Sequence, residues 1–245
     1  MNFKGKTVLV TGSSKGIGAK TIEKFASLGA NVVINYNSSL KEANDLKDYV
    51  ENKYNVKALV VKCDVSNEDE VKDMIDKIIE VFHSINILVN NAGIAIDTVF
   101  EDKTKDNFKR IIDVNLIGTF LVTKYASKYM INEKDSRIIN VSSTNGIDTN
   151  YPESLDYDAS KAGVISLTHN FAKQFAPYIN VNAIAPGWVN TEMNSLLDVD
   201  EYTDNILLKR FASPEEIANV IVFLASEEAS YINNTIIRVD GGELK

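Results

Sequence analysis

The chain has 245 residues, of which 44% are hydrophobic and 24% charged, so its composition is that of a folded globular protein rather than a disordered one. Its formal net charge of -8 argues against a nucleic-acid-binding surface, because neutralising phosphates requires clustered lysine and arginine. A single cysteine, Cys63, and only two histidines exclude an intrachain disulfide and a metal centre rich in either residue. We therefore expect no bound metal and a reducing compartment.

No segment of the sequence is typical of a membrane span or a secretory signal. The first apolar run begins at Thr7, too early for a charged region followed by an apolar region of about 7–15 residues. No apolar stretch approaches the roughly 18 residues that a span requires. Neither a break in composition nor an internal repeat divides the chain. We expect a cytoplasmic protein that forms one domain over residues 1–245.

Short apolar runs predict seven strands. Most are continuous runs of valine, isoleucine and leucine, which is typical of strands buried on both faces. The runs are Thr7–Thr11, Asn31–Tyr36, Ala58–Cys63, Ile85–Asn90, Arg137–Ser142, Ile179–Ala185 and Thr235–Val239.

Segments of helical period lie between these strands. The clearest has an apolar stripe from Val71 to Phe82, preceded by an N-cap candidate in Ser66-Asn67 and by acids in the first turn. Further helices are predicted over Ala19–Leu28, Leu40–Lys53, Asp106–Met130 and Tyr157–Ala176. The repeated alternation predicts an α/β fold with a single Rossmann-type, doubly wound parallel sheet and helices on both faces.

A glycine-rich turn, Thr11–Gly18, joins the first strand to the first helix. Gly12 permits the tight turn, while Gly16 and Gly18 let the backbone approach a pyrophosphate and let the helix approach the sheet. The helix N-terminus offers free N–H donors to an anion. The spacing G-x-x-x-G-x-G departs from the usual G-x-G-x-x-G, and a glycine cluster alone also fits a turn without a ligand. Its place between strand and helix favours a dinucleotide.

Tyr157 and Lys161 lie four residues apart at the start of a predicted helix, so their side chains share one face. An ammonium about 4 Å from a tyrosinate stabilises it by on the order of 4 kcal/mol at an effective dielectric of about 20. That suffices to bring the tyrosine pKa from about 10 to near neutrality, where proton transfer is effective. The alternative is an exposed helical pair. Ser143, at a strand end where parallel sheets bind ligands, favours the catalytic interpretation.

The end of the second strand bears on the choice between NAD and NADP. NAD-selective sites place an acid there, whereas this chain has Asn37–Ser39, and Lys15 adds a cation on the same side. A carboxylate would repel a 2′-phosphate, which these groups would accept. We predict NADP(H). Asn37–Ser39 also fit a cap of the following helix, and the two roles are compatible.

Several dispersed motifs together resemble those of the short-chain dehydrogenases/reductases, in the family's order from Gly5 to Gly242. They are Thr11–Gly18, Asp64-Val65, Asn90–Gly93, Asn115, Ser143, Tyr157–Lys161 and Pro186-Gly187. Within the family the chain is most similar to the 3-oxoacyl-[acyl-carrier-protein] reductases, through Pro186–Met193, Arg210–Ile217 and Val239–Gly242.

This resemblance implies roles for the catalytic residues. Ser143 would hydrogen-bond the substrate carbonyl oxygen, Tyr157 would transfer the proton and Lys161 would also hold the nicotinamide ribose. Asn115 would hold the active-site backbone and a water that relays protons. Ser142 is the rival of Ser143, and the family pattern favours Ser143.

The resemblance also implies cofactor contacts. Asp64 would contact the adenine, Gly93 would let the backbone approach the adenosine ribose, and Val189 and Thr191 would contact the nicotinamide carboxamide or the phosphate. Asp64 also fits a helix cap, and Asn90–Gly93 a strand-end turn. The predicted cofactor-binding residues are Gly12, Ser13, Ser14, Lys15, Gly16, Ile17, Gly18, Asn37, Ser38, Ser39, Asp64, Val65, Asn91, Ala92, Gly93, Tyr157, Lys161, Pro186, Gly187, Val189 and Thr191.

Three functions are compatible with these residues. The first is NADPH-dependent reduction of a 3-oxoacyl group on acyl carrier protein in fatty acid synthesis. The second is the same chemistry on a free sugar, polyol or ketone. A basic patch beside the site would favour the acidic carrier protein, and its absence the free substrate. The third, a non-catalytic NADP-binding sensor, is disfavoured by the presence of Ser143, Tyr157 and Lys161 together.

Two of the predicted helices, Asp106–Met130 and Tyr157–Ala176, are apolar on more than one side, so a second side must be covered. In the family these helices form a bundle between subunits, which implies a homotetramer, with a dimer as the alternative. Residues 190–210 are the predicted lid.

Overall fold

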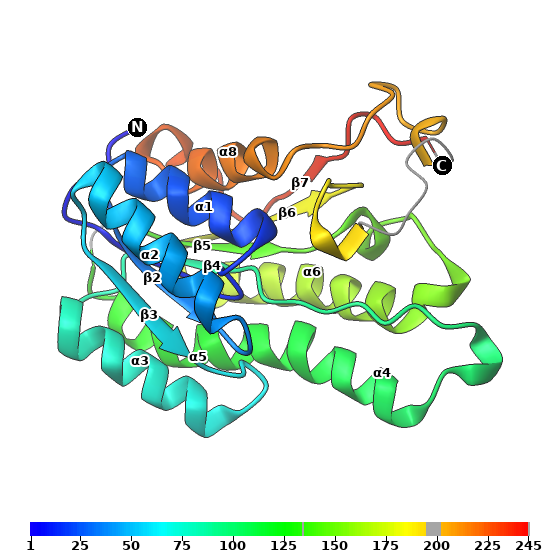
Figure 1. Ribbon diagram of the computed structural model, residues 1–245, viewed down its shortest axis with the longest axis horizontal. Coiled ribbons are helices and arrows are strands. Elements are labelled where there is room, and N and C mark those ends of the chain that lie inside the picture. The colour runs from blue at the N-terminus through cyan, green and yellow to red at the C-terminus, as the bar shows by residue number, and fades with distance from the viewer. Residues whose placement is uncertain (134, 195–201, 245) are drawn as a thin grey trace.

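The computed structural model describes residues 1–133, 135–194 and 202–244 (Figure 1). The part of the predicted lid at residues 195–201 lies outside the described residues. The described residues form a seven-stranded sheet in the order β3-β2-β1-β4-β5-β6-β7, in which every neighbouring pair is parallel. The strands are β1 Thr7–Val10, β2 Asn31–Tyr36, β3 Ala58–Lys62, β4 Ile87–Asn90, β5 Ser136–Val141, β6 Ile179–Pro186 and β7 Ile236–Val239.

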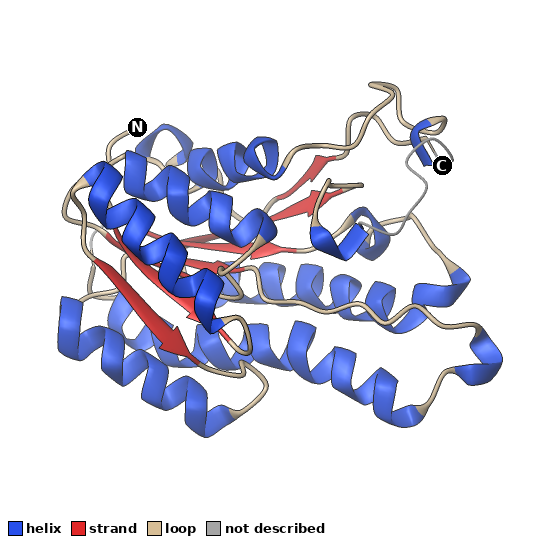
Figure 2. Ribbon diagram, in the orientation of Figure 1, coloured by secondary structure: helices blue, strands red, loops and turns tan. Residues whose placement is uncertain are grey.

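Helices cover both faces of this sheet, and Figure 2 shows the strands between the two helical layers. One layer contains α1 Gly16–Ser27, α2 Leu40–Tyr54 and α8 Pro214–Leu224. The other contains α3 Glu68–Phe82, α4 Lys105–Ile112, α5 Gly118–Met130 and α6 Leu155–Phe175. Single helical turns lie at Phe100–Asp102, Thr144–Gly146, Pro152–Ser154, Glu192–Asn194 and Glu227–Ala229. The predicted doubly wound fold is confirmed.

Each face of the sheet has its own apolar core, which explains why the strands are apolar throughout. Val8 and Val10 of β1 pack towards α1 and α8, while Leu9 packs towards α3 and α5. Burying one such side chain contributes about 1.5–3 kcal/mol. In α3, the predicted stripe from Val71 to Ile78 is buried, and the N-cap is Asn67, whose side chain accepts from the Asp69 and Glu70 amides.

Most predicted boundaries are within two residues of those observed, but the predicted helix Asp106–Met130 is wrong in one respect. A π-helical turn, Asp113–Ile117, divides it into α4 and α5. The wider turn directs the Asn115 amide towards the loop after β4, where it bonds the backbone of Ile94 in both directions at 2.8 and 3.0 Å. Such turns are frequent at functional sites, and one extra residue rotates the apolar positions that follow it by about 100° relative to those before it.

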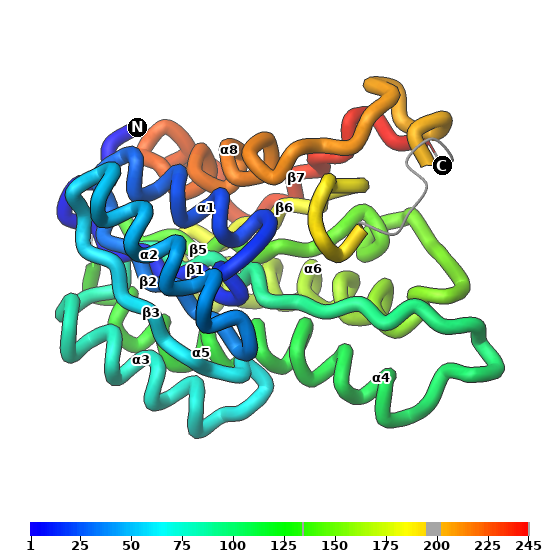
Figure 3. The backbone as a smooth tube through the Cα atoms, viewed as in Figure 1, coloured from blue at the N-terminus to red at the C-terminus, as the bar shows by residue number. Residues whose placement is uncertain are grey.

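The carboxyl ends of β1 and β4 meet at the point where the strand order reverses, which is where parallel sheets of this kind bind ligands. The loop from β4 to α4 runs alongside the start of α6, as the tube in Figure 3 shows. Two catalytic candidates, Ser143 and Tyr157, also lie at this end of the sheet, after β5 and at the start of α6. None of the described helices is long and apolar enough to cross a membrane.

Candidate active site

The glycine-rich turn folds tightly against the loop after β4. Gly12 and Gly16 have φ angles of +59° and +56°, in the left-handed region that favours glycine. A Cβ at Gly12 would lie 2.8 Å from the Ala92 Cα, and one at Gly18 would lie 2.7 Å from the Gly12 carbonyl oxygen. Gly16 is more open, because a Cβ there would meet only Thr191, at 3.6 Å. The turn therefore needs glycine at Gly12 for both conformation and space, at Gly16 for its positive φ and at Gly18 for space.

Asn35 holds this turn in place, a role that the sequence analysis missed. The buried Asn35 side chain accepts a hydrogen bond from the Gly12 amide at 2.9 Å and donates one to the Cys63 carbonyl at 3.1 Å. Its backbone exchanges further bonds with Ser13 at 2.8 and 3.2 Å. An asparagine at the buried end of an otherwise apolar strand was the signal available, because a buried amide must find partners.

The residues at the start of α1 fit a dinucleotide. No side chain caps this helix, since Lys15 occupies the N-cap position without a capping bond. The free N–H groups of the first turn therefore point outwards with the positive end of the helix dipole. They open into a cavity of about 370 Å³ that reaches from Asn37, at the end of β2, to Tyr157 and Lys161 on α6. An anion-binding turn and a candidate proton donor thus share one cavity.

Most of the predicted site residues line that cavity. They are Gly12, Lys15, Gly16, Ile17, Asn37, Asp64, Val65, Asn91, Ala92, Gly93, Ser143, Tyr157, Lys161, Pro186, Gly187, Val189 and Thr191. Six predicted residues are outside its lining: Ser13, Ser14, Gly18, Ser38, Ser39 and Asn115. Ser39 is the N-cap residue of α2 but its side chain makes no capping bond.

Lys15 is paired with two carboxylates, which the sequence analysis did not foresee. Its ammonium lies 3.1 Å from Glu192 and 3.4 Å from Glu42. The hydrogen bonds that the ammonium donates to these two carboxylates raise the pKa of Lys15 above its ordinary value. A 2′-phosphate that approaches Lys15 would have to share it with both acids.

Arg110 of α4 is a further lining residue that the sequence analysis missed. It donates to Asp64 Oδ2 at 2.9 Å and to the Ser66 hydroxyl at 2.8 Å, and so fixes the carboxylate predicted to face the adenine. Burial alone would raise the pKa of Asp64, but the bonds from Ser66 and Arg110 outweigh it and the pKa is lowered. No sequence motif marks Arg110, because the contact spans 46 residues.

The two adjacent serines after β5 have different partners. The Ser142 hydroxyl is buried and donates to the Lys161 carbonyl at 2.9 Å, so it binds the backbone of α6. The Ser143 hydroxyl instead contacts Asn145. It donates to Asn145 Oδ1 at 3.2 Å and accepts from the backbone N–H of Asn145 at 3.3 Å. A hydrogen bond between Ser143 and Tyr157 favours the ionised tyrosine. Only Ser143 therefore faces the candidate proton donor.

Desolvation decides the pKa of the two catalytic candidates on α6, Tyr157 and Lys161. It raises the pKa of Tyr157 to about 12, although the hydrogen bond with Ser143 acts in the opposite direction. It lowers the pKa of Lys161 to about 8. The expectation that Lys161 brings the tyrosine near neutrality is wrong for the protein alone, because its ammonium lies 5.4 Å from the ring centroid and donates to the Val141 carbonyl at 2.9 Å.

Asn115 does not line the cavity, but it lies close to residues that do. A Cβ on Gly93 would lie 3.4 Å from both Asn115 Oδ1 and Lys161 Nζ, so both polar groups lie next to this glycine. The Asn115 amide also donates to the Ser160 hydroxyl at 3.0 Å, which ties the π-helical turn to α6. Its position suits a residue that holds the backbone around Lys161.

Comparisons with known proteins agree with this geometry. A sequence model of the family described as enoyl-(acyl carrier protein) reductase matches residues 12–243. The chain is 41% identical to a 3-oxoacyl-[acyl-carrier-protein] reductase of Aquifex aeolicus, over 99% of this chain and 98% of that protein. It is 39% identical to the corresponding reductase of Thermotoga maritima, over 99% of both chains.

Solved structures share the fold closely. A short-chain dehydrogenase/reductase of Serratia marcescens superimposes with a TM-score of 0.94 at 31% identity, over 99% of both chains. A short-chain dehydrogenase of Burkholderia cenocepacia, solved in complex with NADP, also has a TM-score of 0.94, at 28% identity over 99% of both chains. These full-length matches are stronger than fold similarity alone, so the chain belongs to the short-chain dehydrogenase/reductase family.

Proposed function

We propose that this protein is a 3-oxoacyl-[acyl-carrier-protein] reductase that uses NADPH to form the 3-hydroxyacyl product in fatty acid synthesis. The observation that carries the proposal is that Ser143, Tyr157 and Lys161 line the same cavity as the glycine-rich turn. Relatives that cover nearly the whole chain at 38–41% identity bear the name of this activity. The enzyme is an NADP-dependent oxidoreductase that interconverts a carbonyl and an alcohol.

In the mechanism, the protein supplies the proton and the geometry, and the chemistry that NADPH would supply when bound is hydride transfer to the carbonyl carbon. The Ser143 hydroxyl turns from Asn145 to donate a hydrogen bond to the carbonyl oxygen. The Tyr157 hydroxyl gives that oxygen its proton, and a pKa of about 12 keeps the phenol protonated and ready for this step. Lys161, held by Val141, binds the cofactor ribose and stabilises the tyrosinate that forms.

The end of β2 supports NADP rather than NAD. Asn37 lines the cavity where NAD-selective sites place an acid, and its amide can donate to a 2′-phosphate. Lys15 lies at the same end and supplies the cation, shared with Glu42 and Glu192. Ser38 and Ser39 are proposed to reach the phosphate from the start of α2, where the Ser39 hydroxyl makes no capping bond.

A carbonyl suits this site better than the carbon–carbon double bond named in the family description. Ser143 and Tyr157 place two hydroxyl donors side by side, and a carbonyl oxygen can accept from both as charge develops on it. In a 3-oxoacyl group this oxygen is bonded to the carbon that is reduced, whereas an enoyl thioester can offer only its thioester oxygen, which is not on the reduced carbon. The hydroxyl pair therefore favours the reduction of a ketone.

A free carbonyl substrate is the second candidate, and the charge around the cavity favours it. Asp97 acts electrostatically on Tyr157 and Glu192 lines the cavity, and both are acids, which would repel an acidic carrier protein. Two cations of α4 are already paired, Arg110 with Asp64 and Lys109 with Asp113. The carrier protein would have to be recognised by its pantetheine arm more than by its surface.

An NADPH-oxidation screen separates these functions. It compares acetoacetyl-acyl carrier protein, acetoacetyl-coenzyme A, simple ketones and sugars at equal concentration. We expect the highest kcat/KM with the carrier-bound thioester. A free ketone or sugar that outperforms both thioesters would establish the second candidate, and no turnover with any carbonyl would favour an NADP-binding sensor.

We further propose a homotetramer in the cytoplasm, with a dimer as the alternative. Ile111, Val122 and Val164, which belong to the two helices predicted to be apolar on more than one side, are buried within the protomer. Phe108, Ile117 and Phe120 remain 36–39% exposed along α4 and α5. Exposed aromatic and aliphatic side chains in a row are typical of an interface, so they support a bundle with the same helices of another subunit.

A further inference from the structure

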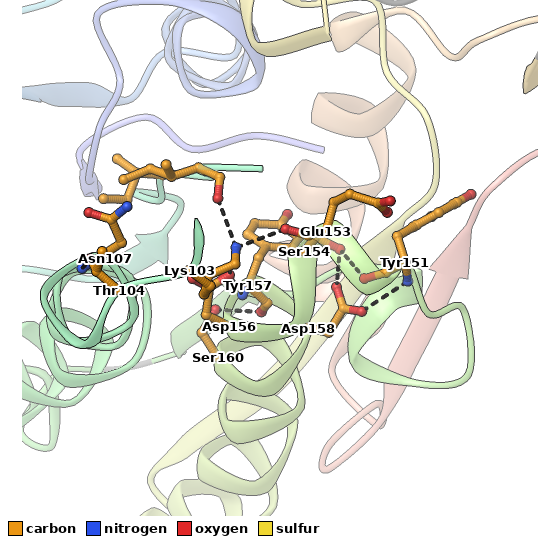
Figure 4. Close-up of polar contacts among 12 residues, drawn as sticks. Lys103, Thr104, Asn107, Tyr151, Glu153, Ser154, Asp156, Tyr157, Asp158 and Ser160 are labelled. Carbon is orange, nitrogen blue, oxygen red and sulfur yellow. Dashed lines mark hydrogen bonds and ion pairs between the residues drawn. The ribbon is translucent and has the colours of Figure 1, made fainter. Parts of the chain in front are cut away.

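Lys103, in the loop before α4, is almost completely buried and its ammonium joins three segments of the chain. It donates to the Ile96 carbonyl at 3.0 Å, to the Glu153 carbonyl at 2.8 Å and to Asp156 Oδ1 at 2.9 Å (Figure 4). The Lys103 side chain is 5% exposed and that of Asp156 is 0% exposed. All three ammonium hydrogens therefore have acceptors, in the loop after β4, the turn before α6 and α6 itself.

Asp156 connects this lysine to the candidate proton donor. Its Oδ1 atom accepts a bond from the backbone amide of Tyr157 at 3.0 Å as well as from Lys103. Its Oδ2 atom is buried without a hydrogen-bond partner among the described residues. Lys103 is therefore the cation that pairs with the Asp156 carboxylate. The oxygen that accepts from Lys103, Oδ1, also accepts from the Tyr157 amide and so fixes the first turn of α6.

Two carboxylates act electrostatically on Tyr157. They are Asp97, in the loop after β4, and Asp158, which follows the tyrosine, and both raise its pKa. Lys103 acts on Asp97 as well as on Asp156, while Glu153, Asp156 and Asp158 are the further acids that act on Asp97. Within the described residues, Lys103 therefore offsets the carboxylate that faces the tyrosine from the β4–α4 loop.

We propose that Lys103 is a positioning residue for Tyr157, which fixes the start of α6 through Asp156 and offsets the carboxylates around the tyrosine. The inference rests on the proposed function only in that Tyr157 transfers the proton. Removing one member of a buried ion pair leaves an uncompensated charge, whereas removing both is often tolerated. The two single replacements must therefore have opposite electrostatic effects on Tyr157, and a simple structural tie would not produce them.

The test compares Lys103→Met, Asp156→Asn and the double variant with the unmodified protein. The first readout is kcat against pH for oxidation of a 3-hydroxyacyl thioester with NADP, the direction that requires the tyrosinate. Lys103→Met should raise the apparent pKa of this profile by about one pH unit, and Asp156→Asn should lower it by about one. The double variant should restore the original apparent pKa. In the reductive direction each single variant should lose about tenfold in kcat, with the KM for NADPH changed less than about threefold.

Two further variants keep the test decisive. Lys103→Gln retains hydrogen-bond donors without the charge, so it should give the same upward shift even if Lys103→Met fails to fold. Lys41→Met, which removes one member of the exposed Lys41–Asp45 pair on α2, is the matched control and should change neither readout.

Single variants that shift the profile in the same direction, or leave it in place, would overturn the proposal. If the unmodified protein oxidises a different alcohol and not the thioester, the proposed substrate is wrong. The pH comparison is then made with that alcohol, and its outcome decides the role of Lys103 separately.

Discussion

Asn145 donates a 2.7 Å hydrogen bond to Asp158 Oδ1, and the same asparagine holds the Ser143 hydroxyl at 3.2 Å. Asp158 is buried and also accepts from the Ser154 hydroxyl at 2.8 Å and from the Tyr151 amide at 3.2 Å. The orientation of the serine proposed to bind the carbonyl thus depends on a carboxylate that follows Tyr157 in the chain. A small displacement of such a group costs up to about a hundredfold in rate.

Replacing Asp158 should therefore disturb catalysis more than cofactor binding. We expect Asp158→Ala to lower kcat by about 10- to 100-fold and to leave the NADPH dissociation constant within about threefold. Ser154→Ala is the comparison, because it removes one bond to Asp158 and a longer 3.4 Å bond from Asn145 but keeps the 2.7 Å bond between Asn145 and Asp158. Steady-state kinetics and NADPH fluorescence titration measure both quantities, and equal losses in the two variants would contradict the assignment.

The two serines after β5 should respond differently to alanine. Ser143→Ala should reduce kcat by at least about a hundredfold without loss of stability, since one donor to the developing oxyanion disappears. Ser142→Ala should instead lower the unfolding free energy by about 1 kcal/mol, because the Lys161 carbonyl loses its partner. Urea unfolding and initial rates distinguish the two. A larger catalytic loss in Ser142→Ala would reverse their roles.

Cofactor preference should depend on the charge around Lys15. Lys15→Ala should weaken NADPH binding by about 5- to 10-fold and leave NADH binding nearly unchanged, because only NADPH carries the extra phosphate. Glu42→Gln should strengthen NADPH binding by about two- to threefold, since it removes one competing acid. Asn37→Asp should weaken NADPH more than NADH. Tighter binding of NADH than of NADPH to the unmodified protein would refute the preference.

Below a pH of about 8, the buried ammonium of Lys161 should destabilise the folded protein. Its folded pKa, about 8, lies below the ordinary 10.5, so the unfolded chain binds more protons between these values and stability rises with pH there. The penalty, on the order of 3 kcal/mol, is fully present below pH 8 and absent above 10.5. Lys161→Met should therefore be more stable than the unmodified protein at pH 7 by about 1–3 kcal/mol, yet inactive. Urea denaturation of both proteins at pH 7 and 10.5 measures the difference in unfolding free energy. A stability advantage of Lys161→Met that grows with pH would contradict the prediction.

Assembly should depend on the exposed apolar row. Phe120→Glu places a charge where we propose a subunit contact, so it should shift light scattering from a tetramer to a smaller species and lower activity. Tyr231→Glu, at a fully exposed side chain outside this row, is the comparison. A fully active monomer of the unmodified protein would remove the basis for the bundle.

The sheet and the proton-transfer residues were predictable because their signals are local. Continuous apolar runs identify β1, β3 and β4, and the i, i+4 spacing places Tyr157 and Lys161 on one face. The glycine-rich turn was recognisable because Gly12 and Gly18 have no room for a Cβ.

Long-range polar contacts were not predictable from the same patterns. Arg110 reaches Asp64 across 46 residues, and Lys103 reaches Asp156 across 53, so neither pair has a local signature. Lys15 appeared free because Glu192 is 177 residues away. The pKa of Tyr157 was misjudged because the distance to Lys161 was assumed and desolvation was left out.

The most direct measurement of the proposed function is the rate of NADPH oxidation with acetoacetyl-acyl carrier protein, for the unmodified protein and for Tyr157→Phe. We expect turnover in the unmodified protein and a loss of at least about a hundredfold in kcat in the variant, with NADPH affinity retained because the ring still packs. No turnover of the thioester by the unmodified protein, or undiminished turnover by Tyr157→Phe, would contradict it.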